Sequence, residues 1–177
     1  MHLPGGRRHH HQIILRYLSP IQTLPGREGL KIKIMKTQLI KQLHNYLLQN
    51  HTDLLIALQE EHRLEHYLKQ KVESVSELLK QLQEESRPAY VIEALCLEEL
   101  TRDLRPSRFN YMRELLETEF EKPYQRMRDS GILTYELINL IGACEPIFEV
   151  FAFGEETADS NQLKYAIMGM IAEYLER

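Results

Sequence analysis

LEELTRDLRPSRFNYMRELLETEF, residues 97–120, decides the fold class of this chain. Apolar residues recur at helical spacing up to Leu104, and Arg105-Pro106-Ser107 then interrupts the pattern. A residue before proline is disfavoured in a helix, and serine is a preferred N-cap, so one helix ends here and another begins. Amphipathic segments separated by caps, prolines and glycines continue to Leu175. The stretch therefore predicts an all-α protein.

The whole pattern predicts a single compact helical domain over residues 35–177, with five to seven helices including one long helix. The expected helix starts are Met35, Thr52 or Asp53, Pro88, Ser107, Thr134, and Asp159 or Ser160. The long helix is expected over residues 52–85, which contain no glycine or proline. Pro123 is expected to kink or split the helix after Ser107, and Gly131 to stop it. Pro146 is expected to close the next helix, and residues 147–153 fit either a short helix or an extended segment.

The second half of the expected long helix carries an apolar seam at 4,3,4,3 spacing: Leu68, Val72, Val75, Leu79 and Leu82. Extended backwards, the seam meets Glu61 and Glu65, which indicates a kink or a change of packing partner near residues 63–66. About two heptads are fewer than a coiled coil requires, so packing inside the domain is favoured. The alternative is an interface in which a second copy or another protein covers the seam.

Residues 1–34 are basic, with six Lys and Arg against one acid, whereas residues 35–177 have a formal net charge of -9. A secretory signal is disfavoured because the apolar run Ile13–Leu18 is short and contains Arg16. The cluster Arg7-Arg8-His9-His10-His11 fits a basic arm for nucleic acid. The favoured interpretation is a disordered basic leader or a misassigned start, because the first clean helical pattern opens at Met35.

Cysteine usage and hydropathy indicate the compartment. Cys96 and Cys144 are too few for a disulfide framework and lie outside metal-ligand spacing, which favours buried free thiols in a reducing environment. No apolar run approaches the roughly 18 residues of a membrane span. We therefore expect a cytoplasmic protein with no membrane partner.

The best candidate for chemistry is His62-Arg63-Leu64-Glu65-His66, which matches the H-x-x-E-H pattern of some zinc peptidases. On a helix, two histidines four residues apart can hold zinc, and the glutamate can act as general base. The motif also needs a third ligand. Glu145 lies at a usable distance along the chain but precedes Pro146 without a matching signature. We therefore treat His62, Glu65 and His66 as weak metal candidates on a charged surface, and predict neither a bound metal nor another cofactor.

Other functional patterns are weaker. Phosphate-binding glycine loops and a nucleophile elbow are absent from the sequence. A helix-turn-helix can be drawn over Tyr124–Ile141, but its second helix has no Lys or Arg before Cys144 and the acidic body would repel phosphate. Adjacent acids fall on different sides of a helix and indicate a solvated surface; they are Glu84-Glu85, Glu98-Glu99 and Glu155-Glu156. The sequence thus predicts no catalytic residue.

Five segments together resemble an uncharacterised family of small all-helical proteins from Bacteroidetes, often carried on conjugative transposons. The segments are Leu97–Leu100, Leu104–Tyr111, Leu115–Phe120, Ser130–Glu136 and Cys144–Phe148. The resemblance covers about Met35 to Arg177 and excludes the leader. It implies an accessory role in a mobile genetic element and carries over no catalytic or ligand residue.

These observations favour a non-enzymatic protein that binds an unknown protein partner or a second copy of itself. One alternative is a nucleic-acid-associated regulator that uses the basic N-terminal arm. A second is an acidic protein that occupies the cationic site of a DNA-binding protein. An unrecognised enzyme ranks behind these.

Overall fold

The computed structural model describes residues 26–177, and this part of the chain is all-helical, as the sequence predicts. Its elements are α1 Arg27–Asn50, α2 Thr52–Glu60, α3 Leu64–Ser74, α4 Ser76–Glu84, α5 Ala89–Thr101, the short 3-10 helix η2 Arg102–Leu104, α6 Arg108–Glu119, α7 Glu121–Asp129, α8 Leu133–Val150 and α9 Asn161–Leu175. The described residues form nine α-helices, more than the five to seven that the sequence predicted. The number is higher because two of the predicted helices are divided. None of the nine described helices is both long enough and apolar enough to cross a membrane.

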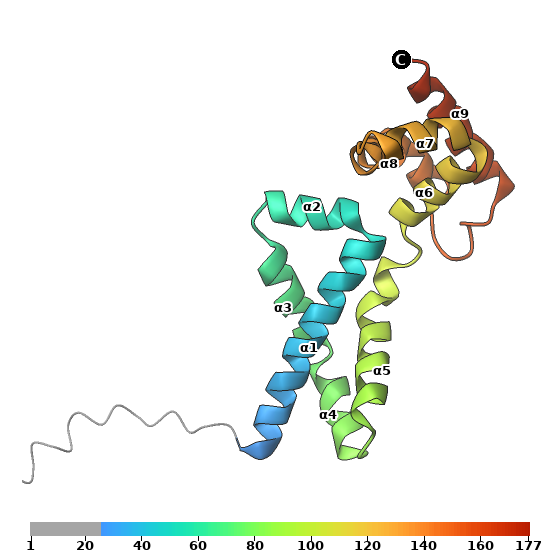
Figure 1. The fold of residues 1–177 in the computed structure, drawn as a ribbon. Helices are drawn as coiled ribbons and strands as arrows, with labels where there is room; N and C mark the ends of the chain where they lie inside the picture. Colours follow the sequence, from blue (N-terminus) through green and yellow to red (C-terminus); the bar gives the residue numbers. More distant parts are fainter. Residues whose placement is uncertain (1–25) are drawn as a thin grey trace, which may run out of the picture.

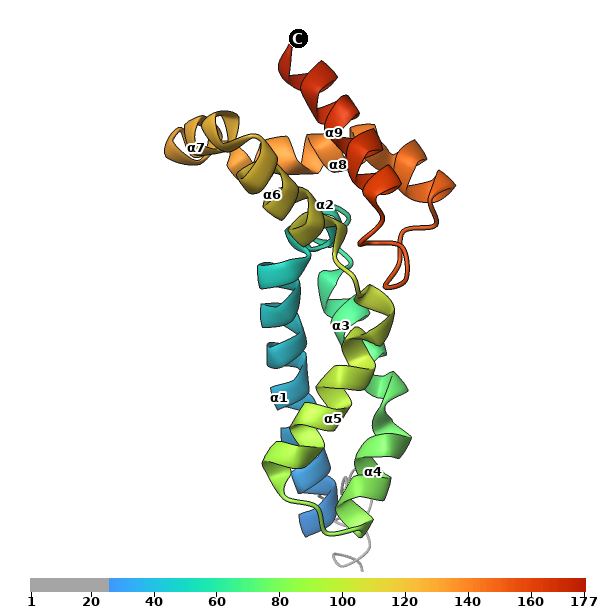
Figure 2. The ribbon, with the colours of Figure 1, turned by 90° about the vertical axis from the view of Figure 1, so that its right-hand side faces the viewer.

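The helices are arranged in two parts, which we call the N-terminal lobe (residues 27–104) and the C-terminal lobe (residues 108–177). In Figures 1 and 2, α1, α3, α4 and α5 run lengthwise, α2 crosses one end, and α6–α9 lie beyond that end. Each lobe has its own cluster of buried side chains. The most deeply buried include Leu39, Leu43, Leu47, Leu79 and Leu100 in the first, and Met112, Leu116, Leu140, Phe148 and Leu163 in the second.

The predicted long helix over residues 52–85 is wrong: the structure divides it into α2, α3 and α4. His62 has a φ of 56° and the Arg63 amide donates to the Leu58 carbonyl at 2.8 Å, which ends α2 in a left-handed turn. A second break falls at Val75. The shift of the apolar face near residues 63–66 explains the first break, because α2 and α3 can each turn their apolar side toward α1. The second break lies inside the regular seam, and α4 packs against α5.

The seam is covered by helices of the same chain. Its five residues are between 1% and 6% exposed and share one cluster with residues of α1 and α5. The proposed interface residues Leu68, Val72, Val75, Leu79 and Leu82 therefore lie inside the N-terminal lobe.

Both prolines expected to interrupt helices lie within helices. Pro146 does not close its helix, because α8 continues to Val150 and places the fully buried Phe148 in the core. That burial outweighs the missing backbone hydrogen bond. The helix that begins after Ser107 was expected to be kinked or split at Pro123. It is split, into α6 and α7, but the break falls at Phe120. Pro123 lies in the first turn of α7, where a helix needs no amide donor. Residues 147–150 are accordingly helical.

The first helix begins at Arg27, about two turns before the boundary expected at Met35. Ile32 and Met35 pack against the N-terminal cluster and extend the stripe of Leu39 and Leu43 backwards. Residues 27–34, which we assigned to the leader, are therefore part of the helical fold. The rest of the leader lies outside the described residues.

Ser107 joins the two lobes. It is the N-cap of α6, as predicted, accepting from the Asn110 amide at 3.0 Å, and its hydroxyl donates to the Asn50 carbonyl at the end of α1. The side chain of Asn110 also donates to that of Asn50 at 2.9 Å. Because Ser107 is only 8% exposed, these bonds are shielded from water. The two lobes are thus linked through the end of α1 and the start of α6.

We expect Ser107→Ala to lower the free energy of unfolding by about 1–2 kcal/mol, because it removes a cap and leaves the Asn50 carbonyl without its donor. Ser160→Ala is the matched control, since Ser160 caps α9 through one long bond of 3.4 Å to the Leu163 amide. It should cost about 0.5–1 kcal/mol. Urea denaturation followed by circular dichroism measures both. Equal losses would show that the bond between lobes adds nothing.

We expect Val75→Glu to unfold the N-terminal lobe, because an unpaired buried charge costs several kcal/mol against a total stability of about 5–15 kcal/mol. Val75 is 3% exposed, whereas its neighbour Ser74 is exposed, so Ser74→Glu is the control for adding a charge. Circular dichroism and sedimentation should show lost helix content for Val75→Glu only. A folded Val75→Glu protein of half the wild-type mass would instead place the seam between two copies.

Candidate functional site

The structure does not place the H-x-x-E-H residues on one helix. His62 occupies the left-handed turn after α2, whereas Glu65 and His66 lie in the first turn of α3. All three are exposed, and Glu65 accepts a 2.6 Å bond from Lys69. That bond holds the pKa of Glu65 below its usual range. Among residues 26–177 no group of three or more His, Cys, Asp or Glu side chains is placed to hold a metal ion.

Glu145, the distant candidate for a third ligand, has a different role. Both of its carboxylate oxygens accept from Arg108 at 2.6 Å, which ties α8 to the start of α6. The Arg108 guanidinium also lies 5.0 Å from the centre of the Phe148 ring. Glu145 is therefore part of the packing of the C-terminal lobe.

The two cysteines are buried thiols, as the sequence predicts. Burial raises the pKa of Cys96, and it raises the pKa of Cys144 to about 11. At neutral pH both side chains are protonated and lack the thiolate that nucleophilic chemistry requires.

His51 is the most deeply buried histidine described, at the junction between α1 and α2. Burial lowers its pKa, although Asp53 and a hydrogen bond with the Leu104 backbone act in the opposite direction. Its ring packs against Tyr46 with centroids 5.7 Å apart. A neutral imidazole in this position packs the junction of the lobes.

The helix-turn-helix drawn over Tyr124–Ile141 corresponds to α7, a turn at Gly131 with φ of 75°, and α8. α8 contains no Lys or Arg, and its Glu136 accepts from the Tyr174 hydroxyl at 2.6 Å. Leu137, Leu140 and Ile141 are buried. A recognition helix needs basic side chains for phosphate, and α8 offers acids instead.

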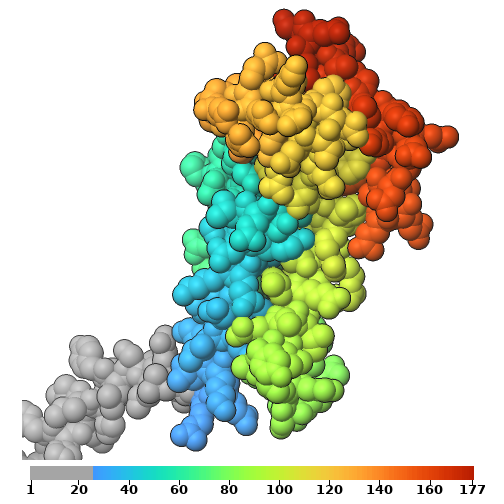
Figure 3. All heavy atoms as spheres, turned by 45° about the vertical axis from the view of Figure 1, so that its right-hand side comes forward, coloured from blue at the N-terminus to red at the C-terminus, as the bar shows by residue number. Residues whose placement is uncertain are grey.

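The structure reveals a different candidate site, a groove at the free end of the N-terminal lobe. It has a volume of about 910 Å³ and lies between the first half of α1, the end of α4 and the start of α5. Figure 3 shows the blue end of α1 beside the yellow-green start of α5 at this end of the molecule. We call it the α1–α5 groove.

The turn between α4 and α5 shapes one wall of the groove. Ser86 has a φ of 56°, and the Arg87 amide donates to the Leu82 carbonyl at 3.1 Å, which ends α4 in a left-handed turn. Pro88 then starts α5 with its fixed φ. The turn places Arg87 and Ala89 at the groove.

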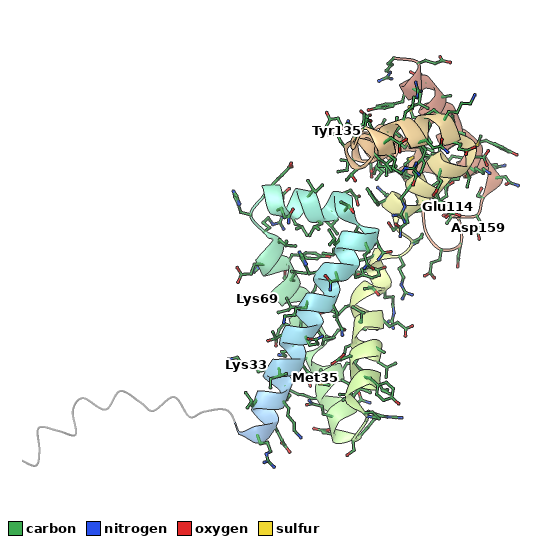
Figure 4. All side chains as sticks on the ribbon, viewed as in Figure 1. Lys33, Met35, Lys69, Glu114, Tyr135 and Asp159 are labelled. Carbon is green, nitrogen blue, oxygen red and sulfur yellow. The ribbon has the colours of Figure 1, made fainter. Side chains whose placement is uncertain are left out.

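Two side-chain hydrogen bonds hold α1, which forms one wall of the groove, against α4 and α5, which form the other. The Gln83 amide donates to the Met35 sulfur at 3.5 Å, and the Gln42 amide donates to Glu93 at 3.0 Å. Figure 4 shows Met35 on the side of α1 that faces α4 and α5, and Lys33 on the opposite side. The separation of the two walls is therefore fixed by specific contacts.

The lining of the groove combines apolar and charged side chains. Ile32, Ile34, Met35, Ala89 and Ile92 supply apolar surface. The charged residues of the lining are Glu28, Glu84, Glu93, Lys31, Lys80 and Arg87. Both signs are present in equal number, an arrangement that suits a protein segment better than a nucleic acid.

The apolar spacing along the chain did not predict this groove. One signal was available: Leu30 and Ile34 are four residues apart, off the stripe of Leu39, Leu43 and Leu47. The structure leaves them 50% and 61% exposed. The partner helices of the groove lie about fifty residues further along the chain, so only the tertiary structure could bring its walls together.

Comparisons of the chain with protein-family models, curated proteins and solved structures found no match.

We expect purified protein to hold well under one equivalent of zinc, because His62 and His66 do not share the helical turn that would bring their imidazoles together. Elemental analysis of the wild type and His66→Ala should give the same value. One equivalent in the wild type that His66→Ala abolishes would show that the turn at His62 rearranges around a metal.

Proposed function

We propose that this chain is a non-enzymatic protein-binding protein and that the α1–α5 groove holds an amphipathic helix of its partner. The observation that carries the proposal is a groove with apolar side chains in its lining, one of which, Ile34, is 61% exposed. An apolar side chain that exposed gains free energy when a partner covers it.

The dimensions of the groove suit a short helix. Its residues on α1 run from Glu28 to Gln38, which corresponds to about 15 Å along the helix axis. That length accommodates two to three turns of a partner helix, which would present apolar residues at i, i+3, i+4 and i+7. The mixed charges of the lining would pair with charges of both signs beside the partner's apolar face.

The chemistry of the groove supports binding over catalysis. Its titratable side chains are acids, lysines and an arginine. Exposed pairs elsewhere, such as Lys36 with Glu73 at 2.8 Å, have the same character. A catalytic site normally gathers groups whose pKa values are shifted by burial and by one another. The buried groups with shifted pKa values, such as His51 and Cys144, lie elsewhere.

The alternatives from the sequence stay predictions. The C-terminal lobe has 7 basic and 13 acidic residues, so a nucleic acid would have to bind elsewhere. The cation cluster of the basic arm, residues 7–11, lies outside the described residues. The acidic charge of this lobe is compatible with the other alternative, in which the chain occupies the cationic site of a DNA-binding protein. A role in a mobile genetic element rests on the family resemblance alone.

We expect Ile34→Glu to weaken partner binding by about fivefold or more, because it puts a charge at the edge of the apolar contact. Leu48→Glu is the matched control, since Leu48 is 52% exposed on the same helix and is absent from the lining of the groove. Both variants should melt like the wild type.

The measurement is affinity capture from host extract with the full chain, quantified by mass spectrometry for all three proteins. A photoreactive residue at position 34 then identifies the partner segment in contact. A protein lost with Ile34→Glu, retained with Leu48→Glu and crosslinked through an amphipathic helix supports the proposal. Identical capture by the three proteins would contradict it.

A further inference from the structure

We propose that the chain carries its own occupant for the α1–α5 groove: the apolar segment Ile13-Ile14-Leu15-Arg16-Tyr17-Leu18. This segment lies outside the described residues, and the inference follows from the groove, the connection to it and the charge around it. Bound there, the segment competes with the partner helix. The competition rests on the proposed function, whereas docking of the segment does not.

The connection between the segment and the groove has sufficient reach. Residues 19–25 separate Leu18 from Gly26, and seven residues span up to about 25 Å. The described structure begins at Gly26, two residues before Glu28 at the near end of the groove. The groove is about 15 Å long along α1, so every part of it is within reach.

The composition of the segment matches the lining of the groove. Five of its six residues are apolar or aromatic, and the lining offers Ile32, Ile34 and Ile92. Burying apolar surface on both sides is the favourable term.

The charge of the leader also fits the groove. Residues 1–25 contain three arginines and no acid. Glu28 and Glu84 line the groove and have no ion-pair partner among residues 26–177. Arg16 stands inside the apolar segment, so docking of its neighbours brings a cation to these carboxylates.

Attachment in the same chain makes a weak contact effective. A link of only seven residues gives the segment an effective concentration at the groove on the order of millimolar. A partner displaces the segment only if its own concentration and affinity for the groove are high enough to outcompete a segment present at that effective concentration. The leader would thereby set the threshold for partner binding.

The test uses the full chain with a photoreactive residue at position 34. We expect crosslinks to residues 13–18 within a single chain, identified by mass spectrometry of the monomer band. Crosslinks in a dimer band would mean that the segment binds a second copy, and their absence from both bands would mean that it does not dock. Either result overturns the inference.

Matched variants provide an independent measurement. Leu15→Glu puts a charge in the apolar segment, and Gln22→Glu makes the same change in the link. Amide hydrogen exchange at residues 27–35 and 86–93 should become about tenfold faster in Leu15→Glu, because the ends of α1 and α5 lose a contact that holds them closed. Gln22→Glu should exchange like the wild type. Equal exchange in the two variants would overturn docking.

Partner capture separates this inference from the proposed function. If both hold, Leu15→Glu captures several-fold more partner than Gln22→Glu, because the groove is free. Crosslinking of the leader with no partner captured would leave the docking inference standing and remove the proposed function. Partner capture that is equal in the two leader variants would remove the competition and leave the proposed function.

Discussion

The apolar stripe of α1 is the constraint on which the N-terminal lobe depends. Leu39, Leu43 and Leu47 have no exposed surface, and burial of each contributes about 1.5–3 kcal/mol. α2, α3 and α5 all contact this helix. The division between α2 and α3 follows from it, because one straight helix could not keep an apolar face that shifts near residues 63–66 against α1.

The same helix also produces the groove. α1 is the longest helix of the described chain, and its first half forms the groove with the end of α4 and the start of α5. Ile32 and Met35 face these neighbours, whereas Leu30 and Ile34 are left largely uncovered. The core ends before the helix does, and of these two uncovered residues Ile34, which lines the groove, is the one that we propose for binding.

At its other end α1 connects the lobes. The Asn50 backbone carbonyl accepts a hydrogen bond from the Ser107 hydroxyl, and the Asn50 side chain accepts one from Asn110. The N-cap residue of α6 therefore supplies a donor to a carbonyl at the C-terminal end of α1 that has no partner within its own helix. Each lobe has a separate apolar cluster, and a few polar bonds link them. Function proposed for the groove therefore concerns the N-terminal lobe, while the C-terminal lobe contributes an acidic surface.

Local sequence determined the all-α class and most of the helix ends. Ser107 and Ser160 cap helices, Gly131 adopts a positive φ, and the cysteines are buried, because each of these depends on residues close by or on the residue's own chemistry. The tertiary structure decided what depended on distant partners. Burial of Phe148 carried α8 through Pro146, and the break at Val75 falls inside a seam whose regular spacing predicted a continuous helix. The groove arises where residues about fifty positions apart meet, a proximity that periodicity in one segment does not encode.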